Sequence, residues 1–222
     1  MITARLMGGL GNQMFQVAAV STLALREKEC DFSFSFSNHY LPHQGNHSHS
    51  YKDNVFRDVP FTEKMIDTKY FYEYESMEYA PILFQDDTTY IGYFQSEKYF
   101  SDHSDYIHNL YSPTEEIDDY IFDKYDGIDF STATFLHVRR GDYIKLSDTH
   151  PPCQPEYYQN AFDSLGKNDI NQVLVFSDDI DWCVSQKDMI DDNIETIYIE
   201  GENDYIDLYM MSLCKNAIIC NS

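Results

Sequence analysis

Two adjacent arginines are the residues best suited to bind a phosphate. Arg139 and Arg140 lie in the segment HVRRGDY at 137–143, which follows an apolar run that predicts a β-strand. The chain has a formal net charge of −23, so the pair is a local cationic point in a negative field. A guanidinium is permanently charged, and its planar fork matches a phosphate in bidentate fashion. The pair therefore favours a phosphorylated ligand; pairing with nearby carboxylates alone is the alternative that the sequence leaves open.

A glycine-rich turn, GGLGNQ at 8–13, follows the first predicted strand and opens a helix. Glycines allow a ligand to approach the backbone closely, and a helix N-terminus favours an anion. The spacing differs from the dinucleotide fingerprint, and the lysine of a P-loop is missing. The turn therefore indicates either an anion site or a tight turn with a purely structural role.

Three carboxylates follow another predicted strand, in the segment FSDDID at 176–181. Asp178, Asp179 and Asp181 could hold a divalent metal, which prefers oxygen ligands. Asp179 and Asp181 also fall at the start of a predicted helix, where carboxylates cap the helix and favour its dipole. We favour capping. The four histidines between residues 39 and 49 lie in a loop broken by proline and glycine, which is typical of a solvated loop rather than a metal site.

The second half of the chain alternates strands and helices. The predicted elements are strands at 134–138, 173–176, 196–199 and 217–220, and helices at 155–165, 179–189 and after Asn203, which can cap its helix. This alternation is the doubly wound α/β pattern, in which ligands bind beyond the carboxyl ends of the strands. Arg139 follows such an end. The sequence stops at Ser222, just past the last predicted strand, so we expect a domain that is truncated at this end.

The first half is less regular. A strand at 2–7, the glycine turn, a helix to Arg26 and an alternating strand at 31–36 predict a β-α-β unit. Residues 38–79 show no clear period, which is typical of loops that vary with the substrate. A strand at 89–94 and a helix from about Ser96 follow.

Composition divides the chain and sets its class. Pro113 and the acidic run after it predict a first α/β domain at 1–112, a linker region at 113–130 and a second domain at 131–222. With 43% hydrophobic residues the chain is globular, and its charge of −23 argues against binding to nucleic acid. Five scattered cysteines indicate free thiols, and no stretch reaches the roughly 20 apolar residues of a membrane span. We expect a cytoplasmic protein without a transmembrane segment.

Five segments together resemble the α-1,2-fucosyltransferases of glycosyltransferase family 11. They are GGLGNQMFQ at 8–16, GYFQSEKYF at 92–100, HVRRGDY at 137–143, FSDD at 176–179 and DLYMMSLCKNAIICNS at 207–222. The resemblance implies an α/β, GT-B-like fold of two facing Rossmann-like domains, the second incomplete here. It implies an inverting transferase of glycan biosynthesis that moves L-fucose from GDP-fucose to the 2-hydroxyl of a galactose-containing acceptor glycan. No metal or other cofactor is implied.

The resemblance also implies roles in the second domain. Arg139 would hold the β-phosphate and stabilise the charge that grows on the leaving GDP, with Arg140 as its support. His137 and Asp207 would lie near the guanine. Asp142 is the candidate general base for the acceptor hydroxyl, although it could instead orient one of the arginines.

Further donor-binding residues are implied outside this segment. Gly9, Gly11 and Asn12, in the glycine turn, would face the donor from the first domain, and Ser222 would join the donor-binding residues.

Two other functions remain open from the sequence. A metal-dependent transferase could use Asp179 and Asp181 with another nucleotide sugar. A catalytically inactive carbohydrate-binding module could use the aromatic segment at 70–79 to stack on sugar rings.

Overall fold

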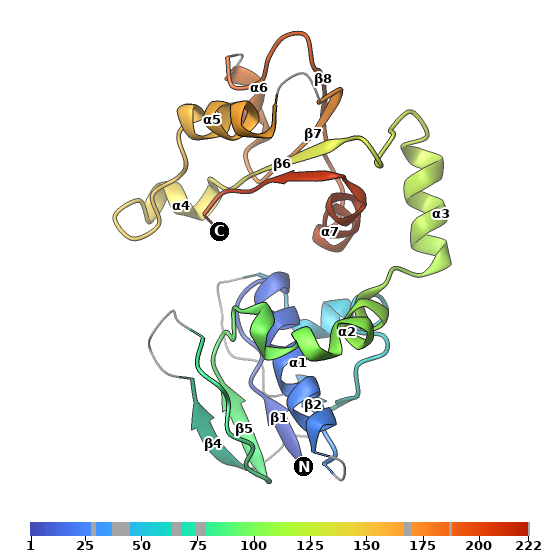
Figure 1. The fold of residues 1–222 in the computed structure, drawn as a ribbon, viewed down its shortest axis with the longest axis vertical. Coiled ribbons are helices and arrows are strands. Elements are labelled where there is room, and N and C mark those ends of the chain that lie inside the picture. Colours follow the sequence, from blue (N-terminus) through green and yellow to red (C-terminus); the bar gives the residue numbers. More distant parts are fainter. Residues whose placement is uncertain are drawn as a thin grey trace. The chain divides into compact units, whose positions relative to one another are not determined.

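The chain forms two compact units, Met1–Thr114 and Glu115–Ser222, shown as a ribbon in Figure 1. The computed structural model describes residues 1–27, 30–36, 45–63, 68–73, 79–166, 170–186 and 188–221. The stretch that composition marked as a linker, 113–130, contains helix α3 (Glu115–Lys124), which is part of the second unit.

The first unit is built on parallel strands. Strands β1 (Ile2–Ala4), β5 (Thr88–Ile91) and β4 (Lys69–Tyr72) form one sheet in the order β1-β5-β4, while β2 (Phe34–Ser35) pairs with β3 (Phe61–Thr62). A parallel bridge between Ile2 and Phe32 connects β1 to the chain entering β2, which confirms the predicted β-α-β unit.

Helix α1 (Leu10–Arg26) is the central helix of this unit, because its small residues allow close packing. Val17, Ala18 and Ala19 are all buried on it. The remaining helical elements of the unit are η2 (Ser48–Tyr51), η3 (Glu97–Tyr99), η4 (Ser101–His103) and α2 (Ser104–Tyr111).

Four predicted elements of the first unit differ from those observed. The strand expected at 2–7 ends at Ala4. The strand expected at 31–36 forms a ladder only at Phe34–Ser35. The strand expected at 89–94 ends at Ile91, because the chain turns sharply at Phe94, whose φ is +51°. The helix expected from Ser96 begins instead as two short 3-10 turns before α2.

The second unit is a four-stranded parallel sheet in the order β8-β7-β6-β9. Its strands are β6 (Thr134–Val138), β7 (Gln172–Ser177), β8 (Glu195–Tyr198) and β9 (Asn216–Ile218), and its helices besides α3 are α4 (Gly141–Lys145), α5 (Pro155–Leu165), α6 (Ile180–Ser185) and α7 (Asp204–Leu213). Helices α5 and α6 lie on one side of the sheet and α7 on the other (Figure 1), which is the predicted doubly wound arrangement.

The core of the second unit explains its regularity. Strand β7 is buried along nearly its whole length, as expected for a parallel strand covered on both faces. Val173 and Val175 pack there with Tyr158 and Phe162 of α5. Helix α6 ends at Ser185 and not at the predicted 189, because the chain turns back to bury Met189 in this core.

Two details of this unit differ from expectation. Helix α4 was not predicted. Asn203 occupies the N-cap position of α7, as expected, but its side chain makes no capping hydrogen bond.

In the part of the chain that the structure describes, no helix has both the length and the apolar character to cross a bilayer.

Candidate functional site

The strand order of the second unit creates a topological switch point, the place where the strand order reverses, at the carboxyl end of β6. The chain leaves β6 toward β7 and β8, then returns to place β9 on the opposite side of β6. Connections on the two sides of this point lie on opposite faces of the sheet, so the loops beyond β6 and β9 separate, and ligands of such sheets bind there. The segment HVRRGDY ends β6 at this switch point.

Arg139 is held by two carboxylates at the switch point. Its Nη2 lies 2.9 Å from Asp142 Oδ1, and its Nη1 lies 3.0 Å from Asp178 Oδ2. The side chain remains 38% exposed. A guanidinium carries five N–H donors, so two carboxylate pairs leave it donors for another anion.

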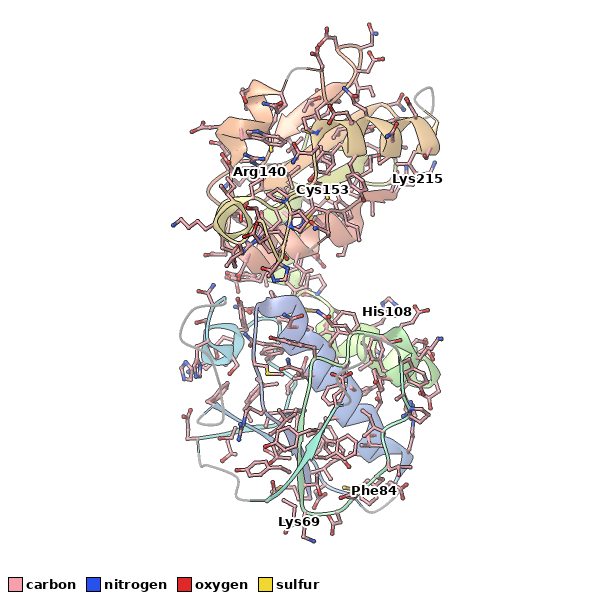
Figure 2. All side chains as sticks on the ribbon, turned by 90° about the vertical axis from the view of Figure 1, so that its left-hand side faces the viewer. Lys69, Phe84, His108, Arg140, Cys153 and Lys215 are labelled. Carbon is pink, nitrogen blue, oxygen red and sulfur yellow. The ribbon has the colours of Figure 1, made fainter. Side chains whose placement is uncertain are left out.

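Arg140 has a different environment, although it is the next residue. Its Nε lies 3.1 Å from Asp179 Oδ2, and its guanidinium stacks 3.8 Å above the ring of Trp182. Only 16% of the side chain is exposed; Figure 2 labels its position in the second unit. Both arginines therefore pair with carboxylates, as the alternative left open by the sequence expects, and they differ in exposure: 38% for Arg139 and 16% for Arg140.

Asp178 shapes the turn that carries both arginines. Besides pairing with Arg139, it accepts a hydrogen bond from the backbone N–H of Arg140 at 2.8 Å. A Cβ on Gly141 would lie 2.6 Å from Asp178 Oδ2, so only glycine leaves room for this carboxylate. Sequence reasoning considered Asp178 only as a metal ligand and missed its role in orienting the arginine segment.

The two neighbouring carboxylates act on helix α6, as the capping interpretation predicts. Asp179 is the N-cap residue, and its side chain accepts a hydrogen bond from the backbone N–H of Trp182 at 3.2 Å. Asp181 lies in the first turn. Among the residues that the structure describes, no group of three or more His, Cys, Asp or Glu side chains could hold a metal ion.

His137 is partly buried beneath the switch point. Burial lowers the pKa of its imidazole, and the nearby charge of Arg139 lowers it further. Its Nδ1 lies 3.6 Å from Cys220 Sγ, which follows β9. His137 is therefore a neutral group between the two diverging strand ends.

Asp207 is an unsatisfied carboxylate in the first part of α7. Its Oδ1 is buried and has no hydrogen-bond partner among the described residues. Burial raises the pKa of the carboxyl to about 6, and the charges of Glu202 and Asp204 add to the effect. A buried acceptor without a donor costs stability, so this oxygen fits a ligand that brings an N–H. Because α7 follows β8, Asp207 belongs to the same edge of the sheet.

The glycine turn of the first unit is fixed by side-chain amides. Gln13 Nε2 donates to the carbonyl oxygens of Gly8 at 3.0 Å and Asn46 at 2.9 Å. Gln16 accepts from the backbone N–H of Met7 and donates to its carbonyl oxygen. Gly8 has a φ of +80°, which favours glycine, and a Cβ there would clash with the side chain of Asn12.

The start of α1 is open to a ligand. Gly9 is the N-cap residue, without a side-chain cap, and no acidic residue stands in the first turn. Among the residues that the structure describes, and apart from chain neighbours and the backbone of the helix itself, a Cβ on Gly9 or Gly11 would meet no atom within 4 Å. Asn12 accepts a hydrogen bond from Gln95 Nε2 at 2.6 Å.

The structure thus gathers four of the predicted residues, His137, Arg139, Arg140 and Asp142, at the end of β6. Gly9, Gly11 and Asn12 gather at the start of α1 in the first unit. Ser222 lies outside the described residues.

Relatives in sequence are glycosyltransferases. The chain matches the family described as "Glycosyl transferase family 11" over residues 1–222. It is 29% identical over 247 residues to an alpha-1,2-colitosyltransferase of Escherichia coli, covering 100% of this chain and 84% of that protein. It is 28% identical over 263 residues to the O-antigen biosynthesis glycosyltransferase WbnK of Escherichia coli, covering 98% of this chain and 85% of that protein.

Solved structures show the same fold. NodZ alpha-1,6-fucosyltransferase co-crystallised with GDP has a TM-score of 0.58 at 11% identity, over 98% of this chain and 87% of that one. Fucosyltransferase NodZ from Bradyrhizobium, as the selenomethionine protein, has a TM-score of 0.56 at 11% identity, covering 96% of this chain and 82% of that one. The α/β, GT-B-like fold class predicted from the sequence is confirmed. The chain belongs to glycosyltransferase family 11 and is a glycosyltransferase.

Proposed function

We propose that this glycosyltransferase moves L-fucose from GDP-fucose to the 2-hydroxyl of a galactose-type acceptor, with inversion and without a metal ion. One observation carries the proposal: the Arg139 guanidinium, still 38% exposed, lies at the switch point of the second unit's sheet. A diphosphate is the ligand that such a group binds best.

Arg139 would act on the leaving group. As the bond between the fucose anomeric carbon and the phosphate oxygen breaks, negative charge grows on GDP. A guanidinium that is already oriented stabilises this charge without reorganisation. Asp142 and Asp178 supply the orientation, at 2.9 and 3.0 Å from two separate nitrogens.

Asp207 would recognise the base. Guanine offers two neighbouring N–H donors on its pairing edge, and a carboxylate can accept from both. The unpartnered Oδ1 of Asp207 supports this assignment. NodZ, a relative in fold that was co-crystallised with GDP, supports the proposal of a guanine nucleotide as ligand.

The acceptor hydroxyl must lose its proton as its oxygen bonds to the anomeric carbon. Asp142 is the candidate general base in the arginine segment, but its carboxylate pairs with Arg139. We propose that Asp142 acts through Arg139, as a positioning residue.

A colitosyl donor is the second candidate, because the relative with 29% identity is named an alpha-1,2-colitosyltransferase. The same name supports the 1,2 linkage. GDP-fucose is the proposed donor, and the experiment below tests it against a colitosyl nucleotide.

The experiment is transfer to a β-galactoside in the presence of EDTA, with the linkage of the product determined by NMR. We expect an α-1,2-fucosyl product. Transfer only from the colitosyl nucleotide would establish the second candidate, and activity that requires added manganese would favour the metal-dependent alternative. Glycan binding without GDP binding would indicate an inactive carbohydrate-binding module.

A further inference from the structure

The carboxylate of Glu73, one residue past β4, binds the turn that follows β5. Its Oε2 accepts hydrogen bonds from the backbone N–H groups of Tyr93 at 2.7 Å and Phe94 at 3.0 Å. Its Oε1 accepts from the hydroxyl of Tyr99 at 3.3 Å. One carboxylate therefore satisfies two consecutive backbone donors of this turn.

The turn needs this support because its backbone is strained. Phe94 has a φ of +51° with a fully buried side chain, a conformation that costs free energy for any residue other than glycine. A Cβ on Gly92 would lie 2.5 Å from Glu73 Oε2, so glycine is required where the carboxylate approaches the turn. Strained backbone of this kind persists only where its surroundings hold it, and it is concentrated at functional sites.

The residue after the strained turn, Gln95, contacts the glycine turn of α1. Gln95 follows Phe94, and its Nε2 donates to Asn12 Oδ1 at 2.6 Å. Asn12 lies in the first turn of α1 and occupies the space beside Gly8 that a Cβ would need. A continuous set of contacts thus runs from Glu73 through the turn and Gln95 to Asn12.

We propose that Glu73 is a positioning residue for the transfer reaction: it holds the turn at 92–95, through which Gln95 fixes the side chain of Asn12. The inference rests on the proposed function, in which Asn12 serves the donor. Glu73 and Gln95 themselves touch no substrate in this account.

The kinetic test uses Glu73→Ala, Glu73→Gln, Gln95→Ala and Asn12→Ala, with GDP-fucose as donor. We expect kcat to fall about 10-fold in Glu73→Ala and in Gln95→Ala, because a misplaced group near the reaction costs rate. Glu73→Gln keeps an oxygen for both N–H groups and should stay within about twofold of the wild type. The double variant Glu73→Ala/Asn12→Ala should be no slower than Asn12→Ala, because both changes act through one side chain.

Tyr99→Phe is the matched control, since it removes the hydroxyl that contacts the other carboxylate oxygen and the backbone of Ala80 but leaves both N–H contacts of Glu73 in place, and it should leave kcat unchanged. Losses that multiply in the double variant, or an unchanged kcat in Gln95→Ala, would overturn the inference. Gln95 is exposed, so its variant carries the test should Glu73→Ala fail to fold.

Amide hydrogen exchange provides a readout that does not depend on the donor. Glu73→Ala should speed exchange in the segments 92–96 and 8–13, whereas Gln95→Ala should speed it in 8–13 alone. A wild type inactive with GDP-fucose would remove the proposed function and leave this result standing. Unchanged exchange at 8–13 in Glu73→Ala would remove the positioning role itself.

Discussion

The end of β6 in the second unit and the start of α1 in the first unit, which carry the candidate site residues, differ in charge. In the second unit the end of β6 is charged, with Arg139 held between Asp142 and Asp178. In the first unit the start of α1 is neutral, and amide side chains such as Gln13 hold its glycine turn.

The difference teaches how binding and turnover are divided. A permanently charged guanidinium such as that of Arg139 binds a diphosphate strongly, so we expect nucleotide affinity to depend on the second unit. Neutral N–H groups and an orienting amide contribute little affinity, so changes in the first unit should lower turnover and leave GDP binding intact.

Arg139→Ala should have the largest effect. In the proposed function this guanidinium stabilises the leaving diphosphate, so kcat/KM with GDP-fucose should fall about 10³-fold when it is removed. Steady-state kinetics measures this loss, and circular dichroism checks that the fold is retained.

Arg140→Ala is the matched control for that change. It removes the contacts to Asp179 and Trp182, so we expect the free energy of unfolding to fall by about 2 kcal/mol. Equal kinetic losses in the two variants at matched stability would contradict their separate roles.

Asp207→Asn should weaken binding of GDP-fucose about 100-fold, because the amide replaces one of the two acceptor oxygens by a donor where the proposed function places the guanine. Below pH 6 the wild type should lose affinity as well, since the pKa of the Asp207 carboxyl is about 6 and the protonated form accepts poorly. GDP-fucose suits this titration, because its diphosphate is a diester with no proton to lose near this pH.

The same substitution should change stability in the opposite sense. The folded-state pKa lies above the ordinary value of 3.8, so the folded chain binds more protons than the unfolded chain between about pH 4 and pH 6. The contribution of Asp207 to the stability of the wild type therefore falls as the pH rises through this window. At pH 8, urea unfolding of Asp207→Asn should show a gain of about 1 kcal/mol, and no gain at pH 4. A difference in stability between the wild type and Asp207→Asn that stays constant from pH 4 to pH 8 would show that Asp207 is satisfied in the fold.

Gly11→Ala tests the first unit. Outside its own helix, a Cβ at this position meets no atom of the described residues within 4 Å, so the helix should gain about 0.5 kcal/mol from the better propensity of alanine. We expect kcat to fall about 10-fold, because in the proposed function the methyl group would crowd the reacting sugar of the donor, which GDP lacks, while GDP affinity stays the same. Full activity would mean that the turn is purely structural.

Asp142→Asn should have the smallest effect, a loss of activity of about fivefold. The amide still offers an oxygen to Arg139, so the orientation of the guanidinium is largely kept. A general base would instead be worth about 10²- to 10⁴-fold. A pH–rate profile of this variant distinguishes the two roles, since loss of a base also removes the acidic limb.

The second unit could be predicted from the sequence far better than the first. The predicted strand at 134–138 and helix at 155–165 agree with β6 and α5 residue for residue, because buried parallel strands and amphipathic helices have strong periodic patterns. The turn at 92–95 could not be predicted, since a left-handed Phe94 is stabilised by Glu73, about 20 positions earlier in the sequence. No local pattern reports such a contact.

The candidate site was predicted in part. Residue type and strand position placed Arg139 at the edge of the sheet. They could not tell it from Arg140, because the distinction depends on Trp182 and Asp179, which pack against only one of the two. The unsatisfied oxygen of Asp207 is equally invisible in the sequence, since it depends on how α7 is buried.

Calorimetric titration of GDP into the wild type, Arg139→Ala and Gly11→Ala tests the division of roles most directly. We predict that the wild type and Gly11→Ala bind GDP with the same affinity and that Arg139→Ala binds it at least 100-fold more weakly. Equal affinity in Arg139→Ala and the wild type, or a loss in Gly11→Ala as large as that in Arg139→Ala, would contradict the account.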